Sequence, residues 1–176
     1  MSSDAALTID EMVYNPGASD NSALFSMTSG LFVLVSGDAA RSGDMVVSTP
    51  VATIGIRGTA VAIQAASEGL ENLIVLLSDP NGNDGLVEVS NDAATVILEA
   101  LGDSVSLALR DQLNLVIARL TPAQMATAFG SALAIMQRYT GSSLGADPAT
   151  FDDLDEEDRD ALRLLFEELI DEASPG

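Results

Sequence analysis

The feature that most constrains this chain is a succession of short apolar runs, each ended by turn-forming residues, between residue 7 and about residue 109. Runs of ~5–8 residues separated by Gly, Asn, Asp and Ser are typical of strands in all-β architectures. Residues 31–36 (LFVLVS) and 72–78 (NLIVLLS) are almost entirely apolar, which indicates strands buried on both faces. No helical pattern intervenes, so βαβ units are not expected. The pattern predicts a β-rich roll, solenoid or sandwich.

The pattern changes after residue 110. Residues 111–120 (DQLNLVIARL) fit a helix or a strand, and both remain alternatives. The next residues predict a helix start, because Thr121 can cap the helix, Pro122 suits its first turn and Gln124 can complete a capping box. Apolar residues at helical spacing follow, and we expect this helix to end near residues 139–141.

A linker and a second, acidic helix at roughly residues 155–173 are predicted to complete the chain. The apolar stripe of this helix would dock either on its own β domain or on a partner. The predicted fold class is α+β, with a β-rich roll, solenoid or sandwich at about residues 7–109 followed by two C-terminal amphipathic helices. The predicted division is 1–109 (β domain), 110–141 (connecting segment and helix) and 142–176 (linker and acidic C-terminal helix).

Composition excludes several classes of function. The chain has 27 acidic residues against seven basic ones and a net charge of −20, which argues against nucleic acid and anionic membranes as partners. We interpret this charge as a source of solubility, with adaptation to salt or to a calcium-rich exterior as the alternative. Cys, His, Trp and Lys are absent, so the usual nucleophiles, imidazole bases and zinc ligands are missing. No apolar run approaches the ~18 residues of a membrane span. We expect no enzyme, no bound metal and no cofactor.

Three segments carry a family resemblance: LTIDEMVYNPG (7–17), FSMTSGLFVLVSG (25–37) and MVVSTPVATIGIRGTAV (45–61). In order and spacing they resemble a FecR-domain protein of proteobacteria over residues 7 to about 100, with GIRGT as the most specific element. The resemblance implies an exported, non-catalytic domain. Family members carry about half a domain and an export signal before the first segment, so the domain is expected to be N-terminally short here. A fragment, a misplaced start or a shortened form would each explain that.

The GIRGT element sets one arginine, Arg57, between Gly55 and Gly58. Glycines permit backbone angles that are closed to other residues, so we expect a strand, a tight corner with turns at both glycines, and a new strand from Thr59. An arginine held at a corner needs a partner if it is even partly buried. Asp10 and Glu11, in the first family segment, are the natural candidates. The alternative is that Arg57 contacts a partner protein.

An acidic turn, residues 79–85 (DPNGNDG), partly fits a calcium-binding loop. Asp79, Asn81 and Asn83 match its first three ligand positions, but Asp84 replaces the required glycine and Glu88 comes too early. A hairpin loop rich in Asn and Gly is the preferred interpretation of this stretch.

The predicted function is therefore a non-catalytic, exported FecR-type module that binds protein partners in envelope sensing or extracellular assembly. One alternative is a regulator in iron-siderophore signalling to an extracytoplasmic-function sigma factor. Others are a calcium-binding, adhesin-like surface protein and a carboxylate hydrolase. The resemblance implies a periplasmic or extracellular location. The sequence is also compatible with a homo-oligomer, formed through an open β edge or through the C-terminal helix.

Overall fold

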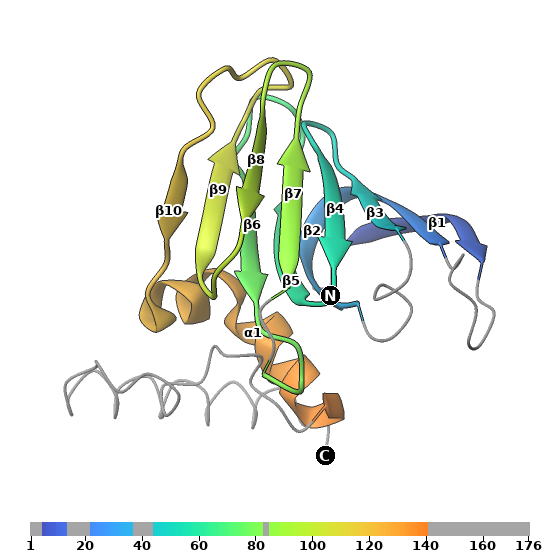
Figure 1. The fold of residues 1–176 in the computed structure, drawn as a ribbon, viewed down its shortest axis with the longest axis vertical. Coiled ribbons are helices and arrows are strands. Elements are labelled where there is room, and N and C mark those ends of the chain that lie inside the picture. The colour runs from blue at the N-terminus through green and yellow to red at the C-terminus, as the bar shows by residue number, and fades with distance from the viewer. Residues whose placement is uncertain (1–4, 14–21, 37–43, 83–84, 141–176) are drawn as a thin grey trace.

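A computed structural model describes residues 5–13, 22–36, 44–82 and 85–140. These residues form ten strands and one helix (Figure 1). In chain order they are β1 (Ala6–Val13), β2 (Ser22–Val35), β3 (Asp44–Ser48), β4 (Thr53–Arg57), β5 (Ala60–Ala65), β6 (Asn72–Leu77), β7 (Leu86–Ser90), β8 (Thr95–Leu98), β9 (Asp103–Leu107), β10 (Ile117–Arg119) and α1 (Pro122–Thr140).

All ten strands belong to one sheet with the order β10-β9-β6-β5-β2-β3-β4-β7-β8, and β1 pairs with β2 off this path. The long strand β2 is shared between two halves of the sheet. Its first part pairs with β1 and, in parallel, with β3, while residues 30–35 pair with β5. We call β1, β3, β4, β7 and β8 with the first part of β2 half-sheet A. Half-sheet B contains β5, β6, β9 and β10 with the second part of β2.

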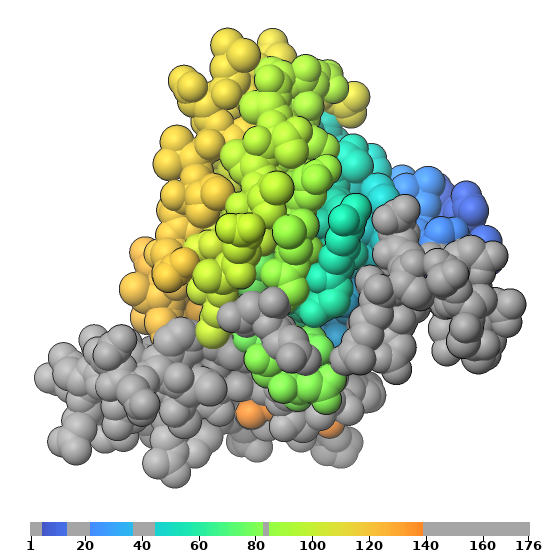
Figure 2. Space-filling model, in the orientation of Figure 1, coloured from blue at the N-terminus to red at the C-terminus, as the bar shows by residue number. Residues whose placement is uncertain are grey.

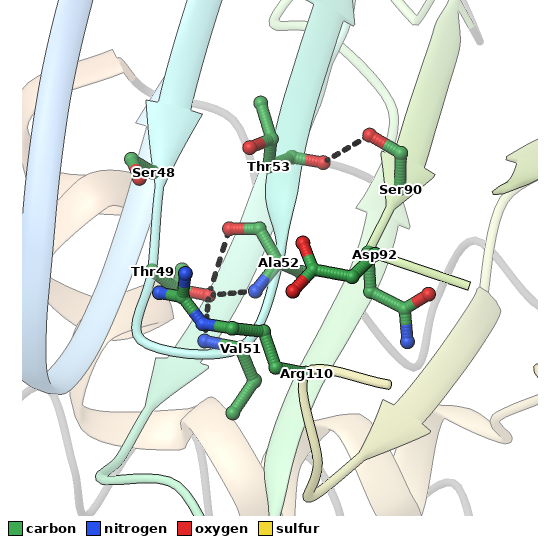
Figure 3. Close-up of a pocket in the computed structure, with 9 residues that line it drawn as sticks. Ser48, Thr49, Val51, Ala52, Thr53, Ser90, Asp92 and Arg110 are labelled. Atoms are coloured by element: carbon green, nitrogen blue, oxygen red, sulfur yellow. Dashed lines mark hydrogen bonds between the residues drawn. The ribbon is translucent and has the colours of Figure 1, made fainter. Parts of the chain in front are cut away.

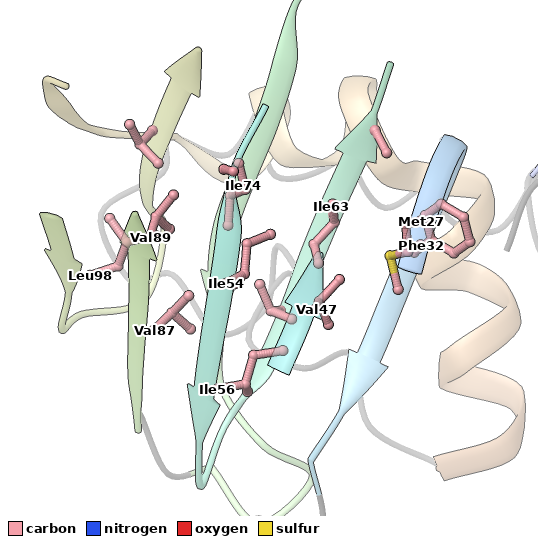
Figure 4. Close-up of a cluster of buried hydrophobic side chains, with 14 of the residues drawn as sticks. Met27, Phe32, Val47, Ile54, Ile56, Ile63, Ile74, Val87, Val89 and Leu98 are labelled. Atoms are coloured by element: carbon pink, nitrogen blue, oxygen red, sulfur yellow. The ribbon is translucent and has the colours of Figure 1, made fainter. Parts of the chain in front are cut away.

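The main core lies between the two half-sheets (Figure 4). Strand β4 contributes Ile54 and Ile56 from half-sheet A, and strands β5 and β6 contribute Ile63 and Ile74 from half-sheet B, all fully buried. Alternation along each strand of half-sheet A places the other residues on an outer face that no described helix covers. The sheet therefore buries one face and leaves the outer face of half-sheet A open to solvent.

Helix α1 covers the outer face of half-sheet B. Its buried residues Met125, Phe129 and Leu133 form a second apolar cluster with Val75 and Leu77 of β6. The helix begins as the sequence predicts: Gln124 Oε1 accepts from Thr121 N at 2.8 Å, and Gln124 N donates to Thr121 Oγ1 at 3.3 Å. It ends at Thr140, as expected. Within the described ranges, no helix combines the length and the apolar character that a bilayer crossing requires.

Loop contacts hold the free ends of the two half-sheets near each other. Asp92 N, after β7, donates to Arg110 O at 2.9 Å, and Asn91 Nδ2 donates to Gln112 O at 3.0 Å. At the other end of these strands, the turn from β8 to β9 crosses from half-sheet A to half-sheet B. The sheet is therefore a nearly closed barrel.

This architecture corrects the predicted fold class. The β-rich part is confirmed, but the roll, solenoid or sandwich with two C-terminal helices is wrong: the described residues form a nearly closed barrel with the single helix α1. The prediction missed the closure of the barrel, because closure depends on pairing between strands that are far apart in the chain. The second predicted helix, at roughly 155–173, lies outside the described residues. Of the two alternatives for residues 111–120, the structure forms a short strand, β10. The proposed domain division stays a prediction.

Candidate functional site

The stretch from Thr49 to Thr59 begins with the turn between β3 and β4. Thr49 Oγ1 accepts from Ala52 N at 3.0 Å, and Thr49 N donates to Ala52 O at 2.8 Å. A threonine that bonds its own turn in this way stabilises the chain reversal. Pro50 lies inside this turn.

Arg110, in the loop after β9, fixes the same turn from outside. Its Nε and Nη2 donate to Pro50 O at 3.2 and 3.1 Å, from 60 residues further along the chain. A small hollow of about 140 Å³ lies here, lined mainly by polar groups that include Thr53, Ser90 and Asp92 (Figure 3). The guanidinium thus has a structural partner, and it joins the loops at one end of the barrel.

The side chains of β4 alternate between the core and the outer face of half-sheet A. Ile54 and Ile56 are buried in the core, whereas Thr53 and Arg57 are exposed on the outer face of half-sheet A. The turn expected at Gly55 is absent, because Gly55 lies within β4 and its φ is not positive. A Cβ added at Gly55 would lie 3.8 Å from the Cβ of Glu88, which is ordinary contact. Neither backbone angle nor lack of space requires glycine at this position.

The corner is found at Gly58 alone. Its φ of 63° lies in the left-handed region that favours glycine, and β5 follows from Ala60. Gly85 packs directly on this corner, since a Cβ there would lie 2.1 Å from Arg57 O. Two glycines distant in sequence therefore allow two backbones to meet where β4 ends.

Thr59 is a buried polar residue that links three segments. Its N–H donates to Ser36 Oγ at 2.9 Å, and Ser36 N donates back to Thr59 O at 3.1 Å. Its hydroxyl donates to the carbonyl of Leu77 at the end of β6. Because every one of these groups is buried, Thr59 holds the ends of β2 and β6 at the start of β5.

Strand register aligns the outward residues of half-sheet A in rows that cross its six strands. One row consists only of hydroxyl residues: Thr8, Ser26, Ser48, Thr53, Ser90 and Thr95. Cross-strand pairs of this kind stabilise a sheet. They also form a row of short, uncharged side chains on its exposed face. The sequence alone does not reveal this row, because the row exists only once the strand register is known. A Ser or Thr next to most apolar runs was the available signal.

The neighbouring row has Gly55 at its centre. Val46 and Glu88 lie opposite Gly55 on β3 and β7, and Leu24 and Ile97 lie further out on β2 and β8. The missing side chain leaves a hollow of about 280 Å³ between Val46, Glu88, Thr53 and Arg57. We call it the Gly55 hollow. In the space-filling view, strands β3, β4, β7 and β8 (cyan to green) form much of the face turned to the reader (Figure 2).

Asp10 and Glu11 lie on β1, and two strands, β2 and β3, separate β1 from β4. Strand pairing therefore does not place either carboxylate beside Arg57, given about 4.8 Å between neighbouring strands. Asp10 Oδ2 instead accepts from Ser26 Oγ at 2.6 Å on the adjacent strand. The side-chain pairing of Arg57 with Asp10 or Glu11 stays a prediction.

The acidic turn at 79–85 is only partly described, because residues 83 and 84 lie outside the described ranges. Asp79 is buried, and its Oδ1 accepts from Asn81 N at 2.8 Å while its carbonyl accepts from Gly82 N at 2.9 Å. These bonds form a side-chain-capped turn. The predicted hairpin is wrong, because β6 pairs with β5 and β9 while β7 pairs with β4 and β8, so this loop connects the two half-sheets. In the described part of the chain, no three acidic side chains converge as metal ligands would.

Comparison with known proteins gives limited likeness. No protein-family model matches the chain, and neither does any curated protein. The resemblance to FecR-domain proteins thus stays a prediction. Two crystal structures of candidate anti-sigma factors from Parabacteroides distasonis ATCC 8503 are similar in fold. One has a TM-score of 0.46 at 16% identity and covers 66% of this chain and 49% of its own. The other has a TM-score of 0.47 at 12% identity, covering 76% and 53%. The chain spans about half the length of these two proteins.

Proposed function

We propose that this protein is a non-catalytic, FecR-type module that binds partner proteins through the outer face of half-sheet A. Its setting would be envelope sensing or extracellular assembly, in the periplasm or outside the cell. The FecR resemblance of residues 7 to about 100 supports the setting, and signalling to a sigma factor is one form that the role can take. The fold supports the choice of this face as the binding surface. Helix α1 covers the outer face of half-sheet B, and the described residues place no such helix on half-sheet A.

The observation that carries this proposal is the glycine at the centre of the exposed face. Gly55 weakens β4, because glycine in a strand interior costs conformational entropy and offers no side chain to pack. The fold does not require it, since its φ is ordinary and a methyl group would fit. Glycine inside a strand is found where another chain approaches closely. A partner side chain inserted between Val46 and Glu88 would explain why the hollow is kept open.

Site-specific photocrosslinking tests the proposal. A photoreactive residue placed at Thr53, beside the Gly55 hollow, should capture a partner from the envelope fraction of the source organism. The same residue at Thr127, which is exposed on α1, is the matched control. The captured protein is then purified, and its affinity is measured against the wild-type chain and against Gly55→Val and Arg57→Ala.

The expected result separates binding from folding. Gly55→Val should leave the free energy of unfolding unchanged or raise it by up to about 1 kcal/mol, because valine favours strands. It should weaken partner binding at least about tenfold, which is ~1.4 kcal/mol. Capture at Thr127 but not at Thr53, or full affinity in both variants, would show that this face is not the binding surface.

A further inference from the structure

Strand β1 is an edge strand that exposes almost all of its length. Among the described residues it pairs only with β2, and seven of its eight residues are exposed. Figure 1 shows β1 (dark blue) with the first part of β2 extending to one side of the barrel. Within the described ranges the outer edge of β1 thus has no strand partner, and its backbone N–H and C=O groups can pair with another strand.

The apolar residues of β1 continue the core layer beyond the barrel. Ile9 lies opposite Phe25 and Met12 opposite Ala23, on the face that Phe25 turns to the core. Their side chains are nevertheless 58% and 65% exposed. A strand added beside β1 would extend half-sheet A and cover both residues, which a solvent-facing edge strand has no need to carry.

One exposed stretch of the edge of β9 is covered in a way that β1 is not. Strand β10 stops opposite Val105, so β9 would expose its edge beyond that residue. There the side-chain amide of Gln112 takes the place of a strand: Nε2 donates to Ser106 O at 3.3 Å, and Oε1 accepts from Ala108 N at 3.1 Å. The chain thus caps one edge with a side chain and leaves β1 without such a cap among its described residues.

The charges on β1 indicate which kind of strand can pair with its free edge. Asp10 and Glu11 lie together on β1, within a chain of net charge −20. A second copy pairing through β1 would bring these four carboxylates together, which disfavours self-association. A basic strand would be attracted instead.

We infer that the free edge of β1 takes up an extended segment of a partner protein in which apolar and basic residues alternate. Its apolar side chains cover Ile9 and Met12, its basic side chains face Glu11 on the other side, and main-chain hydrogen bonds supply much of the affinity. This inference rests on the proposed function and names the chemistry of the partner.

Peptide binding tests the inference on the full chain. The probe is a nine-residue peptide of alternating Val and Lys, and the control peptide has the same charge with prolines that prevent strand pairing. Calorimetry should give an affinity for the probe at least about tenfold above that for the proline peptide. Hydrogen exchange should show slower exchange for β1 amides on binding. The double variant Ile9→Lys/Met12→Lys should lose that affinity, whereas Thr127→Lys/Ser131→Lys, with the same gain of two positive charges at exposed positions of α1, should keep it.

Four results would overturn the inference. Equal binding of both peptides would indicate general charge attraction, and no binding would exclude strand addition of this kind. A dimer of the wild-type chain that Ile9→Lys/Met12→Lys dissociates would make a second copy the occupant. The fourth result separates the inference from the proposed function: if a partner captured at Thr53 binds Ile9→Lys/Met12→Lys with full affinity, the β1 inference is wrong and the proposed binding face stands.

Discussion

At the scale of single residues, the GIRGT element divides into structural and exposed positions. Gly58 makes the corner, and Thr59 fixes the ends of β2 and β6 to it through buried hydrogen bonds. Gly55 and Arg57 lie on the exposed face. Gly58 and Thr59 explain how the barrel is held together, whereas Gly55 and Arg57 lie on the face where a partner would bind.

Replacing Thr59 with valine is expected to destabilise the protein by about 1–3 kcal/mol. The change keeps the side-chain shape but leaves the buried carbonyl of Leu77 without its donor. Thr95→Val, on the exposed end of the hydroxyl row, should change stability by no more than about 0.5 kcal/mol. Urea unfolding of the two variants measures both effects, and equal midpoints would show that Thr59 is not a stabilising link.

The sequence predicts part of this division. A glycine that starts a new strand predicts the corner at Gly58, because local backbone angles decide it. The same reasoning fails at Gly55, which has the same residue type but an ordinary strand conformation. What distinguishes the two is the neighbouring strand β7, whose register with β4 is a non-local property.

At the scale of elements, Asp103 joins the β8–β9 turn to β10. Its Oδ2 accepts from Ala100 N at 3.0 Å and from Glu99 N at 3.3 Å, and its Oδ1 accepts from Arg119 Nη2 at 2.8 Å. Partial burial acts to raise the pKa of this carboxyl, but the hydrogen bonds from Arg119 and the two amides, with the charge of Arg119, outweigh it. The pKa is held below its ordinary value of 3.8.

This lowered pKa predicts an acid-dependent contribution to stability. A carboxyl whose pKa is lower in the folded state stabilises the fold above its unfolded pKa, and the contribution is lost as pH falls below 3.8 through the folded pKa. Asp103→Asn should therefore lower the free energy of unfolding by about 1–2 kcal/mol at pH 7. The difference from the wild type should shrink toward pH 2.

Urea unfolding at pH 7 and at pH 2 measures this difference, on either side of the isoelectric point near 4.1. Asp111→Asn, an exposed change of the same charge, is the control. A difference for Asp103→Asn that stays constant over the whole range would mean that its ionisation does not matter to the fold.

The sequence could predict those elements that are specified by residues close together in the chain. The start of α1 follows from Thr121 and Gln124, and the structure forms those hydrogen bonds. Strand β10 could not be assigned, because residues 111–120 carry apolar residues at both periods. Its three residues become a strand through antiparallel pairing with residues 103–105 of β9, and no local pattern encodes that pairing.

At the scale of the whole molecule, β2 makes one sheet out of two halves. Its first part pairs with β1 and β3 and its second part with β5, and the change of partner comes at Gly30. The φ of Gly30 is 112°, and a Cβ there would lie 2.5 Å from the Cα of Ala5. The parallel pairing of β2 with β3 and this change of partner are the features that a list of strands cannot predict.

Gly30→Ala should therefore act on both half-sheets at once. A positive φ and a backbone overlap together should cost about 2–4 kcal/mol, more than Gly69→Ala, where φ is 91° but the added Cβ meets nothing within 4 Å. Because β2 belongs to both halves, Gly30→Ala should keep a single urea transition at a lower midpoint, with faster exchange of amides in β4 and in β6 alike. Two separate transitions, or faster exchange confined to β1 and β2, would mean that the half-sheets fold independently and that the bend in β2 does not couple them.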